Sequence, residues 1–272
     1  MNYKKVVLVT GASSGIGEAT AQILYEAGWK VYAGARRIDR MEALEAKGIH
    51  TMKLDVSAEE SMTECVAKIL SKEGRIDALV NNAGYGSYGS LEDVPMEEAK
   101  YQFEVNVFGL ARLTQLVLPN MRERKRGKII NVSSIGGKLG EPHGCWYHAT
   151  KFAVEGLSDS LRMELQQFNI DVVVIQPGAI KTEWGGIARE KMLKISGNTV
   201  YGNLAMKHIA MLEKFDGQGS EPSVIADAIL TACMSAKPKT RYAIGNSAGM
   251  MLFMKKVLPD RLFDKMMLSY MK

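Results

Sequence analysis

Tyr147 and Lys151 are the first residues in this 272-residue sequence whose types and spacing could do chemistry. They lie four positions apart in a stretch with helical periodicity, Trp146 to Phe168, so both side chains share one face of the expected helix. A free tyrosine has a pKa of about 10 and is a poor acid or base at neutral pH. Because a nearby ammonium favours the phenolate, we expect Lys151 to lower the pKa of Tyr147 and allow it to exchange a proton with an alcohol or a carbonyl.

Ser134 lies thirteen positions before Tyr147, just beyond the apolar run Ile129–Val132, which is typical of a strand. In a parallel sheet, ligands bind at the edge where the strands end. The sequence therefore places a hydroxyl near the expected tyrosine, although a serine that caps a turn has the same local pattern.

A glycine-rich turn, Thr10-Gly-Ala-Ser-Ser-Gly-Ile-Gly17, follows the apolar run Val6–Val9 directly. Glycines allow a sharp turn and close approach of the backbone to a pyrophosphate, and the next helix offers unpaired N–H groups to the phosphates. The spacing is G-x-x-x-G-x-G, not the G-x-G-x-x-G of the standard dinucleotide fingerprint. A turn without a ligand is the alternative, but the position at the first strand–helix junction favours a cofactor site.

Short apolar runs alternate with helical patterns through most of the chain. The runs that predict strands are Val6–Val9, Val31–Ala35, Leu79–Val80, Ile129–Val132 and Val172–Ile175, with Arg241–Ile244 as a candidate for the last strand. Helical patterns cover Ile16–Ala27, Arg40–Lys47, Ala58–Ser71, Met96–Met121, Trp146–Phe168 and Ser223–Met234. The pairs Asp39 with Glu42 and Ser57 with Glu60 have the spacing of helix capping boxes. This alternation predicts an α/β fold, a Rossmann-type doubly wound parallel sheet with helices on both faces.

The C-terminal third of the chain has a different pattern. Residues 182–219 form a long irregular segment with helical fragments, and 248–270 predict one amphipathic helix rich in Met and Leu. No linker or break in composition divides the chain, so we expect a single domain over 1–272. We expect 182–219 to be a substrate lid that hinges at its glycines.

Four motifs, in this order, resemble those of the short-chain dehydrogenase/reductase superfamily. They are Thr10-Gly-Ala-Ser-Ser-Gly-Ile-Gly17, Asn81-Asn82-Ala83-Gly84, Tyr147-His-Ala-Thr-Lys151 and Pro177-Gly178. The resemblance runs from about residue 5 to about residue 182. It implies an oxidoreductase that interconverts a carbonyl and a secondary alcohol, in which the nicotinamide carries the hydride and the protein supplies position and charge.

The resemblance also implies a catalytic tetrad of Asn106, Ser134, Tyr147 and Lys151. Ser134 would hydrogen-bond the substrate oxygen, and its spacing to Tyr147 favours it over the adjacent Ser133. Asn106 would bend its helix and hold a water near Lys151. Lys151 would also touch the nicotinamide ribose.

The end of the second predicted strand selects the cofactor. An acidic residue there would bind the ribose 2′-hydroxyl of NAD, but this sequence has Arg36 and Arg37. A guanidinium pairs well with a 2′-phosphate, so we expect NADP(H); two exposed arginines at a helix entry are the alternative. By resemblance Asp55 and Val56 contact the adenine, and Asp55 could also cap the next helix. The residues expected to contact the cofactor are Gly11, Ser13, Ser14, Gly15, Ile16, Gly17, Arg36, Arg37, Asp55, Val56, Asn82, Ala83, Gly84, Tyr147, Lys151, Pro177, Gly178, Ile180 and Thr182.

Composition argues against several other classes of protein. The net charge is +5 and the pI about 8.9, and the basic run Arg122–Lys128 is more typical of a solvated loop than of a nucleic-acid site, so we expect no nucleic-acid partner. The three cysteines and four histidines form no disulfide framework and no metal spacing. No apolar run approaches a signal peptide or a membrane span, so we expect a cytoplasmic protein. The resemblance places His143 and Cys145 at the substrate pocket and His148 at a variable position.

Within the superfamily, Ala33–Arg37, Asn106–Gly109 and the long C-terminal part resemble the branch of 17β-hydroxysteroid and retinol dehydrogenases and related bacterial reductases. The expected lid is rich in large apolar residues, namely Trp184, Ile187, Met192, Leu193, Ile195, Tyr201, Leu204, Met206 and Met211. Its basic residues, expected at the rim of the pocket, are Lys181, Arg189 and Lys191. We therefore expect a bulky, mostly apolar, steroid-like or lipid-like substrate rather than a small keto compound.

Two expectations concern assembly and class. The helices that hold Asn106 and Tyr147 pair between subunits in many relatives, so the resemblance implies a homodimer or homotetramer. A catalytically silent NADP(H)-binding regulator of the same fold is the alternative to an enzyme. Such a protein should have lost Tyr147 or Lys151, and this chain has both.

Overall fold

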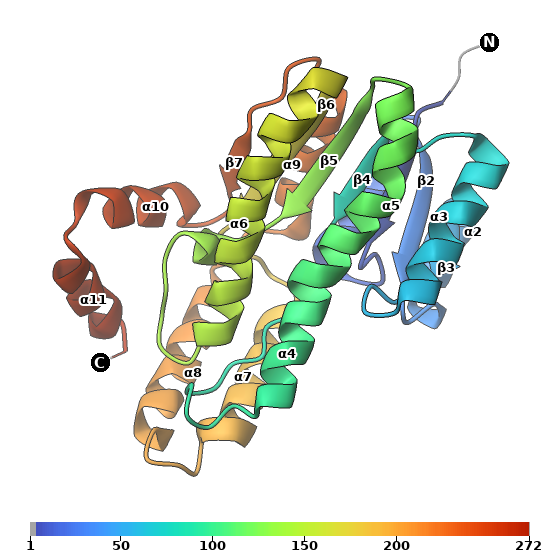
Figure 1. The fold of residues 1–272 in the computed structure, drawn as a ribbon. Helices are drawn as coiled ribbons and strands as arrows, with labels where there is room; N and C mark the ends of the chain where they lie inside the picture. Colours follow the sequence, from blue (N-terminus) through green and yellow to red (C-terminus); the bar gives the residue numbers. More distant parts are fainter. Residues whose placement is uncertain (1–3, 272) are drawn as a thin grey trace.

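A single seven-stranded sheet runs through the computed structural model, which describes residues 4–271 (Figure 1). The strands are β1 (Val6–Thr10), β2 (Lys30–Ala35), β3 (His50–Lys53), β4 (Ala78–Asn81), β5 (Gly127–Val132), β6 (Ile170–Pro177) and β7 (Arg241–Ile244). Their order is β3-β2-β1-β4-β5-β6-β7, and every neighbouring pair is parallel. The predicted doubly wound parallel fold is confirmed. The expected span 1–272 includes residues 1–3 and 272, which lie outside the described part.

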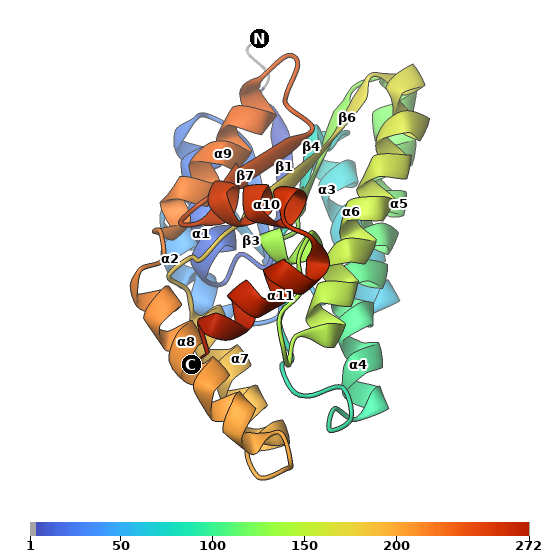
Figure 2. The ribbon, with the colours of Figure 1, turned by 90° about the vertical axis from the view of Figure 1, so that its left-hand side faces the viewer.

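Helices cover both faces of the sheet, as Figure 2 shows, with α1, α2 and α9 on one side and α3, α5 and α6 on the other. The helices are α1 (Gly15–Glu26), η1 (Asp39–Met41), α2 (Glu42–Ala46), α3 (Glu59–Glu73), α4 (Met96–Phe103), η2 (Glu104–Phe108), α5 (Gly109–Glu123), η3 (Ile135–Gly137), α6 (Cys145–Leu165), η4 (Gln166–Phe168), α7 (Glu183–Ser196), α8 (Gly202–Gly217), α9 (Pro222–Met234), α10 (Ala248–Val257) and α11 (Asp260–Ser269). No helix within residues 4–271 has both the length and the apolar character that crossing a membrane requires.

The central strand β1 shows why the core has two layers. All five of its residues are buried, and successive side chains of a strand point to opposite faces. Val7 and Val9 pack in the layer under α1 and α9, while Val6 and Leu8 pack in the layer under α3 and α5. A strand buried on both faces has to be apolar throughout, which is the pattern that the sequence showed.

Strand β3 was absent from the strands predicted by apolar runs. It pairs only with β2, from Tyr32 opposite His50 to Ala35 opposite Lys53, and forms one edge of the sheet. Its residues are partly or largely exposed. An edge strand of this kind does not need a continuous apolar run, so the sequence carried no such signal.

Both predicted capping boxes are wrong. The residue before α3 is Ala58, which has no capping side chain, and η1 is preceded by Ile38. Ser57 instead donates from its backbone N–H and its hydroxyl to Asp55 Oδ1, at 2.9 and 2.7 Å. An aspartate side chain commonly accepts from the backbone N–H two residues later and so forms a tight turn. Asp55 therefore shapes the loop after β3 and does not cap the helix.

Two C-terminal predictions also need correction. Residues 182–219 are mostly regular, because α7 and α8 are two well-formed helices that pack together through Ala188 and Ala205. Residues 248–270 form two helices, α10 and α11, instead of one. Pro259 lies between them, and proline both lacks an N–H and keeps the preceding residue out of the helical region. In Figure 2 the chain then turns back toward α8, where the rings of Phe215 and Tyr270 lie 6.0 Å apart.

The basic run Arg122–Lys128 is used in part by the fold itself. Arg124 Nη1 lies 2.8 Å from Asp77 Oδ1, at the start of β4. Lys128 Nζ donates to the backbone carbonyl of Ala232, at 2.9 Å, at the end of α9. These two cations join the sheet to its covering helices.

Candidate active site

A cavity of about 680 Å³ opens along the carboxyl ends of the strands. It lies where β1 and β4 are neighbours but lead to helices on opposite faces, which is the place where open α/β sheets bind ligands. The predicted residues that line it are Gly11, Ser13, Ser14, Gly15, Ile16, Arg36, Arg37, Asp55, Val56, Asn82, Ala83, Gly84, Ser134, Tyr147, Lys151, Pro177, Gly178, Ile180 and Thr182. Gly17 and Asn106 lie behind the lining.

The glycine-rich turn fits a dinucleotide pyrophosphate. Gly11 has a φ of +66°, and a Cβ there would lie 2.9 Å from the Cα of Ala83. A Cβ at Gly17 would lie 2.2 Å from the carbonyl oxygen of Gly11, so only glycine lets α1 approach the turn this closely. Ser14 precedes α1 without capping it through its side chain, which leaves N–H groups at the helix start for an anion.

Thr10 ties the turn to the end of β4. Its hydroxyl donates to the Val80 carbonyl at 3.3 Å and accepts from the N–H groups of Asn82 and Ala83, at 3.0 and 2.9 Å. Asn82 Nδ2 donates back to the Thr10 carbonyl at 2.9 Å. The two motifs at residues 10–17 and 81–84 therefore form one hydrogen-bonded unit under the cavity.

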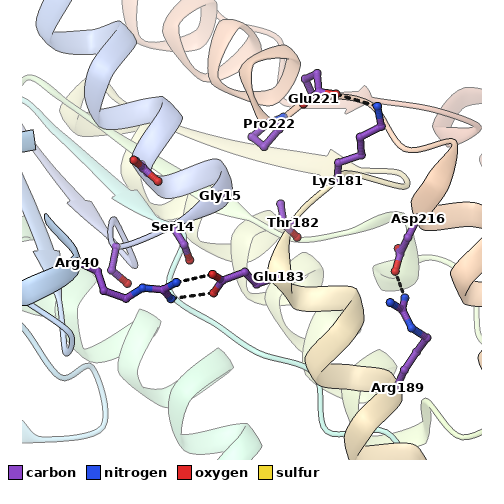
Figure 3. Close-up of a pocket in the computed structure, with 12 residues that line it drawn as sticks. Ser14, Gly15, Arg40, Lys181, Thr182, Glu183, Arg189, Asp216, Glu221 and Pro222 are labelled. Atoms are coloured by element: carbon purple, nitrogen blue, oxygen red, sulfur yellow. Dashed lines mark hydrogen bonds and ion pairs between the residues drawn. The ribbon is translucent and has the colours of Figure 1, made fainter. Parts of the chain in front are cut away.

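Three arginines lie beyond the end of β2, beside this cradle, and Figure 3 shows one of them, Arg40, with its partner Glu183. Arg36 Nη1 donates to the Tyr101 hydroxyl at 2.8 Å, and Arg37 Nη2 lies 3.5 Å from Ser13 Oγ. Arg40, which the sequence prediction missed, makes two hydrogen bonds to the carboxylate of Glu183, at 2.8 and 2.5 Å. Arg40 follows Arg36 by four residues, and this spacing could have indicated that Arg40 belongs to the same group of arginines after β2.

Ser134, Tyr147 and Lys151 come together at the end of β5. The Ser134 hydroxyl hydrogen-bonds the Tyr147 phenol and also accepts from the N–H of Gly136 at 3.0 Å, so it caps a turn as well. Lys151 Nζ donates to the carbonyl of Val132 at 3.0 Å and lies 5.9 Å from the centre of the Tyr147 ring. Both predicted positions of Ser134, beside the tyrosine and at a turn, are therefore observed.

The pKa values of this group differ from the expectation. Burial raises the pKa of Tyr147 to about 12, the hydrogen bond from Ser134 opposes this, and the charge of Glu141 adds to it. Burial lowers the pKa of Lys151 to about 8, against the opposing charge of Glu155. Lys151 does not lower the pKa of Tyr147 as expected, because its ammonium is directed to the Val132 carbonyl.

Asn106 interrupts the long helix that was predicted over 96–121. The five residues of η2 form a π-helical turn between α4 and α5, the kind of bulge that often marks a functional site. Asn106 Oδ1 accepts from the N–H of Tyr85 at 3.0 Å, and its Nδ2 donates to the Tyr85 carbonyl at 2.9 Å. Asn106 Nδ2 also donates to Thr150 Oγ1 at 3.1 Å. The predicted local distortion is present, and the amide holds the loop after β4 against α6.

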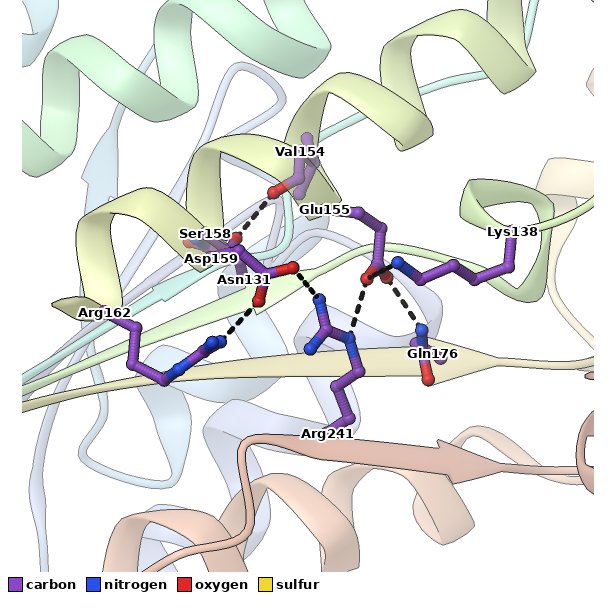
Figure 4. Close-up of polar contacts among 9 residues, drawn as sticks. All are labelled: Asn131, Lys138, Val154, Glu155, Ser158, Asp159, Arg162, Gln176 and Arg241. Atoms are coloured by element: carbon purple, nitrogen blue, oxygen red, sulfur yellow. Dashed lines mark hydrogen bonds and ion pairs between the residues drawn. The ribbon is translucent and has the colours of Figure 1, made fainter.

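Glu155 is a buried acid that sequence reasoning did not single out (Figure 4). It follows Lys151 by one helical turn, is 2% exposed, and accepts from Gln176 Nε2 at 2.9 Å. Its other oxygen lies 2.9 Å from Arg241 Nε and 3.1 Å from Lys138 Nζ. This network joins α6 to β6, to β7 and to the segment after η3.

The substrate half of the cavity combines aromatic, apolar and acidic groups. The rings of Trp184 and Tyr88 lie 5.0 and 5.7 Å from that of Tyr147. Other lining residues on this side are Leu139, Glu141, His148, Ile187, Met211, Leu212, Phe215, Met251, Met267 and Tyr270. Three of the large lid residues named from the sequence thus face the cavity: Trp184, Ile187 and Met211. By contrast Met192 is buried in the lid, and Leu193 and Met206 are exposed.

The residues before Tyr147 are arranged differently from the expectation. Cys145 is exposed and is not among the residues that line the cavity. His143 lies behind the wall, where its Nδ1 faces Nδ1 of His208 at 3.1 Å, and burial lowers its pKa to about 4. His148, expected at a variable position, lines the cavity and bonds the Gly136 carbonyl through Nδ1 at 2.9 Å. Among residues 4–271, no three His, Cys, Asp or Glu side chains gather as a group that could hold a metal ion.

Comparison with known proteins agrees with this geometry. Residues 5–192 match the family model for short chain dehydrogenases. The chain is 36% identical to the 3-ketodihydrosphingosine reductase of Bacteroides thetaiotaomicron, over 96% of this chain and 95% of that protein. It is 33% identical to the NADPH-dependent 3-dehydrocapnine reductase of Ornithobacterium rhinotracheale, over 98% of both. Human retinol dehydrogenase 8 is 34% identical over 87% of this chain and 80% of that protein, which supports the predicted branch.

Solved structures share the fold and hold both kinds of nicotinamide cofactor. A short-chain dehydrogenase from Streptomyces avermitilis has a TM-score of 0.81 and 35% identity, covering 93% of this chain and 92% of that one. A metagenomic short-chain oxidoreductase in complex with NADP has a TM-score of 0.69 at 29% identity, over 88% and 95% of the two chains. A 3-ketoacyl-(acyl-carrier-protein) reductase from Brucella melitensis complexed with NADH has a TM-score of 0.73 at 29% identity, over 87% and 94%. With its parallel sheet, its glycine-rich cradle and a tyrosine and lysine at the end of β5, the chain belongs to the short-chain dehydrogenase/reductase family of oxidoreductases.

Proposed function

We propose that this protein interconverts a bulky, apolar ketone and its secondary alcohol with NADP(H). One observation carries the proposal: Ser134, Tyr147 and Lys151 gather in the cavity that also contains the glycine-rich cradle. The three side chains that could transfer a proton are thus next to the site for a hydride carrier. A protein that only bound the cofactor as a regulator would not need these three side chains.

The proposed steps follow from the positions of the side chains. When bound, the nicotinamide would supply or accept the hydride at the substrate carbon. Ser134 would donate a hydrogen bond to the substrate oxygen, and Tyr147, protonated because burial raises its pKa to about 12, would donate the proton in the reducing direction. Once Tyr147 has given up its proton, the ammonium of Lys151, which donates to the Val132 carbonyl in this structure, would turn toward the tyrosinate and stabilise it. Asn106 would position the loop after β4 and the water expected near Lys151.

The preference for NADP(H) is supported by Arg36, Arg37 and Arg40. All three lie beyond the end of β2, where a carboxylate would favour NAD, and Arg36 and Arg37 line the cavity. One relative is named as NADPH-dependent and one solved structure holds NADP, although another holds NADH. Asp55 and Val56 line the same part of the cavity and would face the adenine.

The substrate class is supported by the lining of the other half. Its methionine, leucine and aromatic side chains come from α8, α10 and α11 and suit a long or bulky hydrocarbon. Two relatives are named for lipid ketones, 3-ketodihydrosphingosine and 3-dehydrocapnine. We propose that residues 182–219 act as the lid over this half, with Trp184 against Tyr147.

Assembly is also part of the proposal. Phe108 and Phe152, on the outer faces of η2 and α6, are 56% and 47% exposed. Exposed aromatic residues on two adjacent helices suit a subunit contact, so we propose a homodimer or homotetramer through this surface. Light scattering that reports only a monomer at micromolar concentration would exclude it.

The direct test is oxidation of NADPH with a panel of ketones of rising apolar bulk. We expect kcat/KM to rise with chain length, and Trp184→Ala to flatten the rise. A clear preference for small keto compounds would contradict the substrate class. If no carbonyl or alcohol is turned over although NADPH binds, the alternative of a silent regulator is correct.

A further inference from the structure

Glu141 is an acid in the substrate half of the cavity that has no part in the proposed proton transfer. It lies in the segment between η3 and α6, and its side chain is 15% exposed where it lines the cavity. Its Oε1 accepts from the hydroxyl of Tyr88 at 2.8 Å. The Tyr88 ring is 5.7 Å from the ring of Tyr147, so Tyr88 lies next to both Glu141 and the proposed proton donor.

The carboxylate of Glu141 is ionised. Burial by itself raises the pKa of this group, but the neighbouring His208, His148 and Tyr88 more than offset that effect and hold it at about 2. A buried negative charge is costly unless a positive group compensates it. The question is therefore which cation Glu141 faces.

Within residues 4–271 the groups at ion-pair distance from the Glu141 carboxylate are two imidazoles, His148 and His208, at 3.8 and 3.7 Å. His148 Nδ1 bonds the Gly136 carbonyl and its Nε2 accepts from the N–H of Glu141 itself, so this imidazole donates no hydrogen bond to the carboxylate. His208 Nε2 is 3.7 Å from Oε2, too long for a good hydrogen bond, and its other nitrogen faces His143. No lysine or arginine of residues 4–271 lies within ion-pair distance of Glu141.

Other acids in the cavity contrast with Glu141. Glu98 forms an ion pair with Lys191, and Asp216 forms one with Arg189. Both carboxylates are thus compensated inside the protein. Glu141 presents its charge to the cavity next to the place where the carbonyl would lie.

We propose that Glu141 binds an ammonium group of the substrate, so that the preferred ketone is a long-chain amino ketone whose amine lies within a few bonds of the carbonyl. The proposal rests on the carbonyl reduction proposed above. The amine would sit between Glu141 and Tyr88, the carbonyl would face Ser134 and Tyr147, and the hydrocarbon would run toward Met251 and Met267. A charge-assisted hydrogen bond in a desolvated site discriminates strongly against an analogue that lacks the partner.

The first experiment compares a long-chain 2-amino-3-ketone with the 3-ketone of the same length without the amine. We expect kcat/KM to favour the amino ketone by about ten- to hundredfold in the unaltered protein. Glu141→Gln keeps an oxygen for the Tyr88 hydroxyl but loses the charge, and should bring the ratio close to one. Glu98→Gln is the matched control, because it removes a paired acid from the same cavity and should leave the ratio in place. Because the ratio is taken within each variant, a general loss of activity cancels.

The second experiment separates this inference from the proposed function. Calorimetry on the NADP⁺-loaded protein compares dodecylammonium with 1-dodecanol, both below their aggregation concentrations. Tighter binding of the amine that Glu141→Gln abolishes would support the amine site even if no ketone were reduced. Equal reduction of both ketones, or equal binding of both probes, would overturn the amine site while leaving the carbonyl chemistry intact.

Discussion

Arg40 and Glu183 form a two-pronged ion pair, with hydrogen bonds of 2.8 and 2.5 Å, between the segment after β2 and the first residue of α7. Arg37 Nη2 lies 3.8 Å from the same carboxylate. The pair thus joins the arginine-rich end of the cofactor cradle to the proposed lid (Figure 3). Glu183 occupies the two cations that a 2′-phosphate would also attract.

Replacing Glu183 should therefore strengthen the binding of NADP⁺. In Glu183→Gln the two arginines are free for the phosphate, and because an exposed ion pair is weak and easily replaced, we expect Kd to fall by about two- to fivefold. Calorimetric titration measures it, with NAD⁺ as the control ligand. An equal change for NAD⁺ would assign the effect to the lid and not to the phosphate.

Replacing Arg36 should reverse part of the cofactor preference. Arg36→Asp removes a cation beyond β2 and adds the acid that suits the 2′-hydroxyl of NAD. Loss of one charge-assisted bond predicts about a ten- to hundredfold drop in the NADPH:NADH ratio of kcat/KM. Equal or better use of NADH by the unaltered protein would refute the proposed specificity.

Tyr147→Phe should abolish turnover without abolishing cofactor binding. The variant keeps the ring that packs on Trp184 and Tyr88 but has no proton to transfer, so kcat should fall by at least about 10²- to 10⁴-fold. Fluorescence titration should show that NADPH still binds. Tyr201→Phe, which removes an exposed hydroxyl bonded to Glu92, is the control and should keep its rate.

The pKa of Lys151, lowered to about 8 by burial, predicts a pH dependence. Its ammonium is present below that pH and is lost as the pH rises through it, while Tyr147 stays protonated. Reduction measured as kcat/KM, which reports the free enzyme, should therefore fall above about pH 8. Lys151→Arg keeps the charge at all these values, so its profile should be flat even if its rate is lower. The same fall in Lys151→Arg would assign the titration to another group.

Glu155→Gln should destabilise the protein and shift the same profile. The variant leaves Arg241 and Lys138 without their carboxylate, and because both cations are partly exposed, we expect a loss of about 1–3 kcal/mol in the free energy of unfolding. Removing the charge that raises the pKa of Lys151 should also move the fall in kcat/KM to lower pH. Urea denaturation gives the first quantity. Asp159→Asn changes the more exposed part of the network in Figure 4, so it should lower the free energy of unfolding by less than Glu155→Gln does.

Much of the fold could be predicted because its signals are local. The strands β1, β2, β4, β5 and β6 are buried on both faces and therefore show as apolar runs. Strand β3 lies at an edge of the sheet, is partly exposed and therefore shows no apolar run. The helices α7 and α8 were obscured because their glycines and mixed polarity weaken the periodicity, and the break at Pro259 was passed over although its residue type signals it.

The sequence by itself determined the family and the glycine-rich turn, because each motif depends on residues a few positions apart. Gly11 and Gly17 meet across one turn, and Tyr147 and Lys151 across one helical turn. Tertiary structure alone decided which charges face one another. Arg40 and Glu183 are 143 residues apart, and Glu155 and Arg241 are 86 apart. Such pairs depend on how strands and helices are stacked, so no local pattern contains them. The same holds for Glu141, whose lack of a lysine or arginine partner among residues 4–271 became visible only when every neighbour was in place.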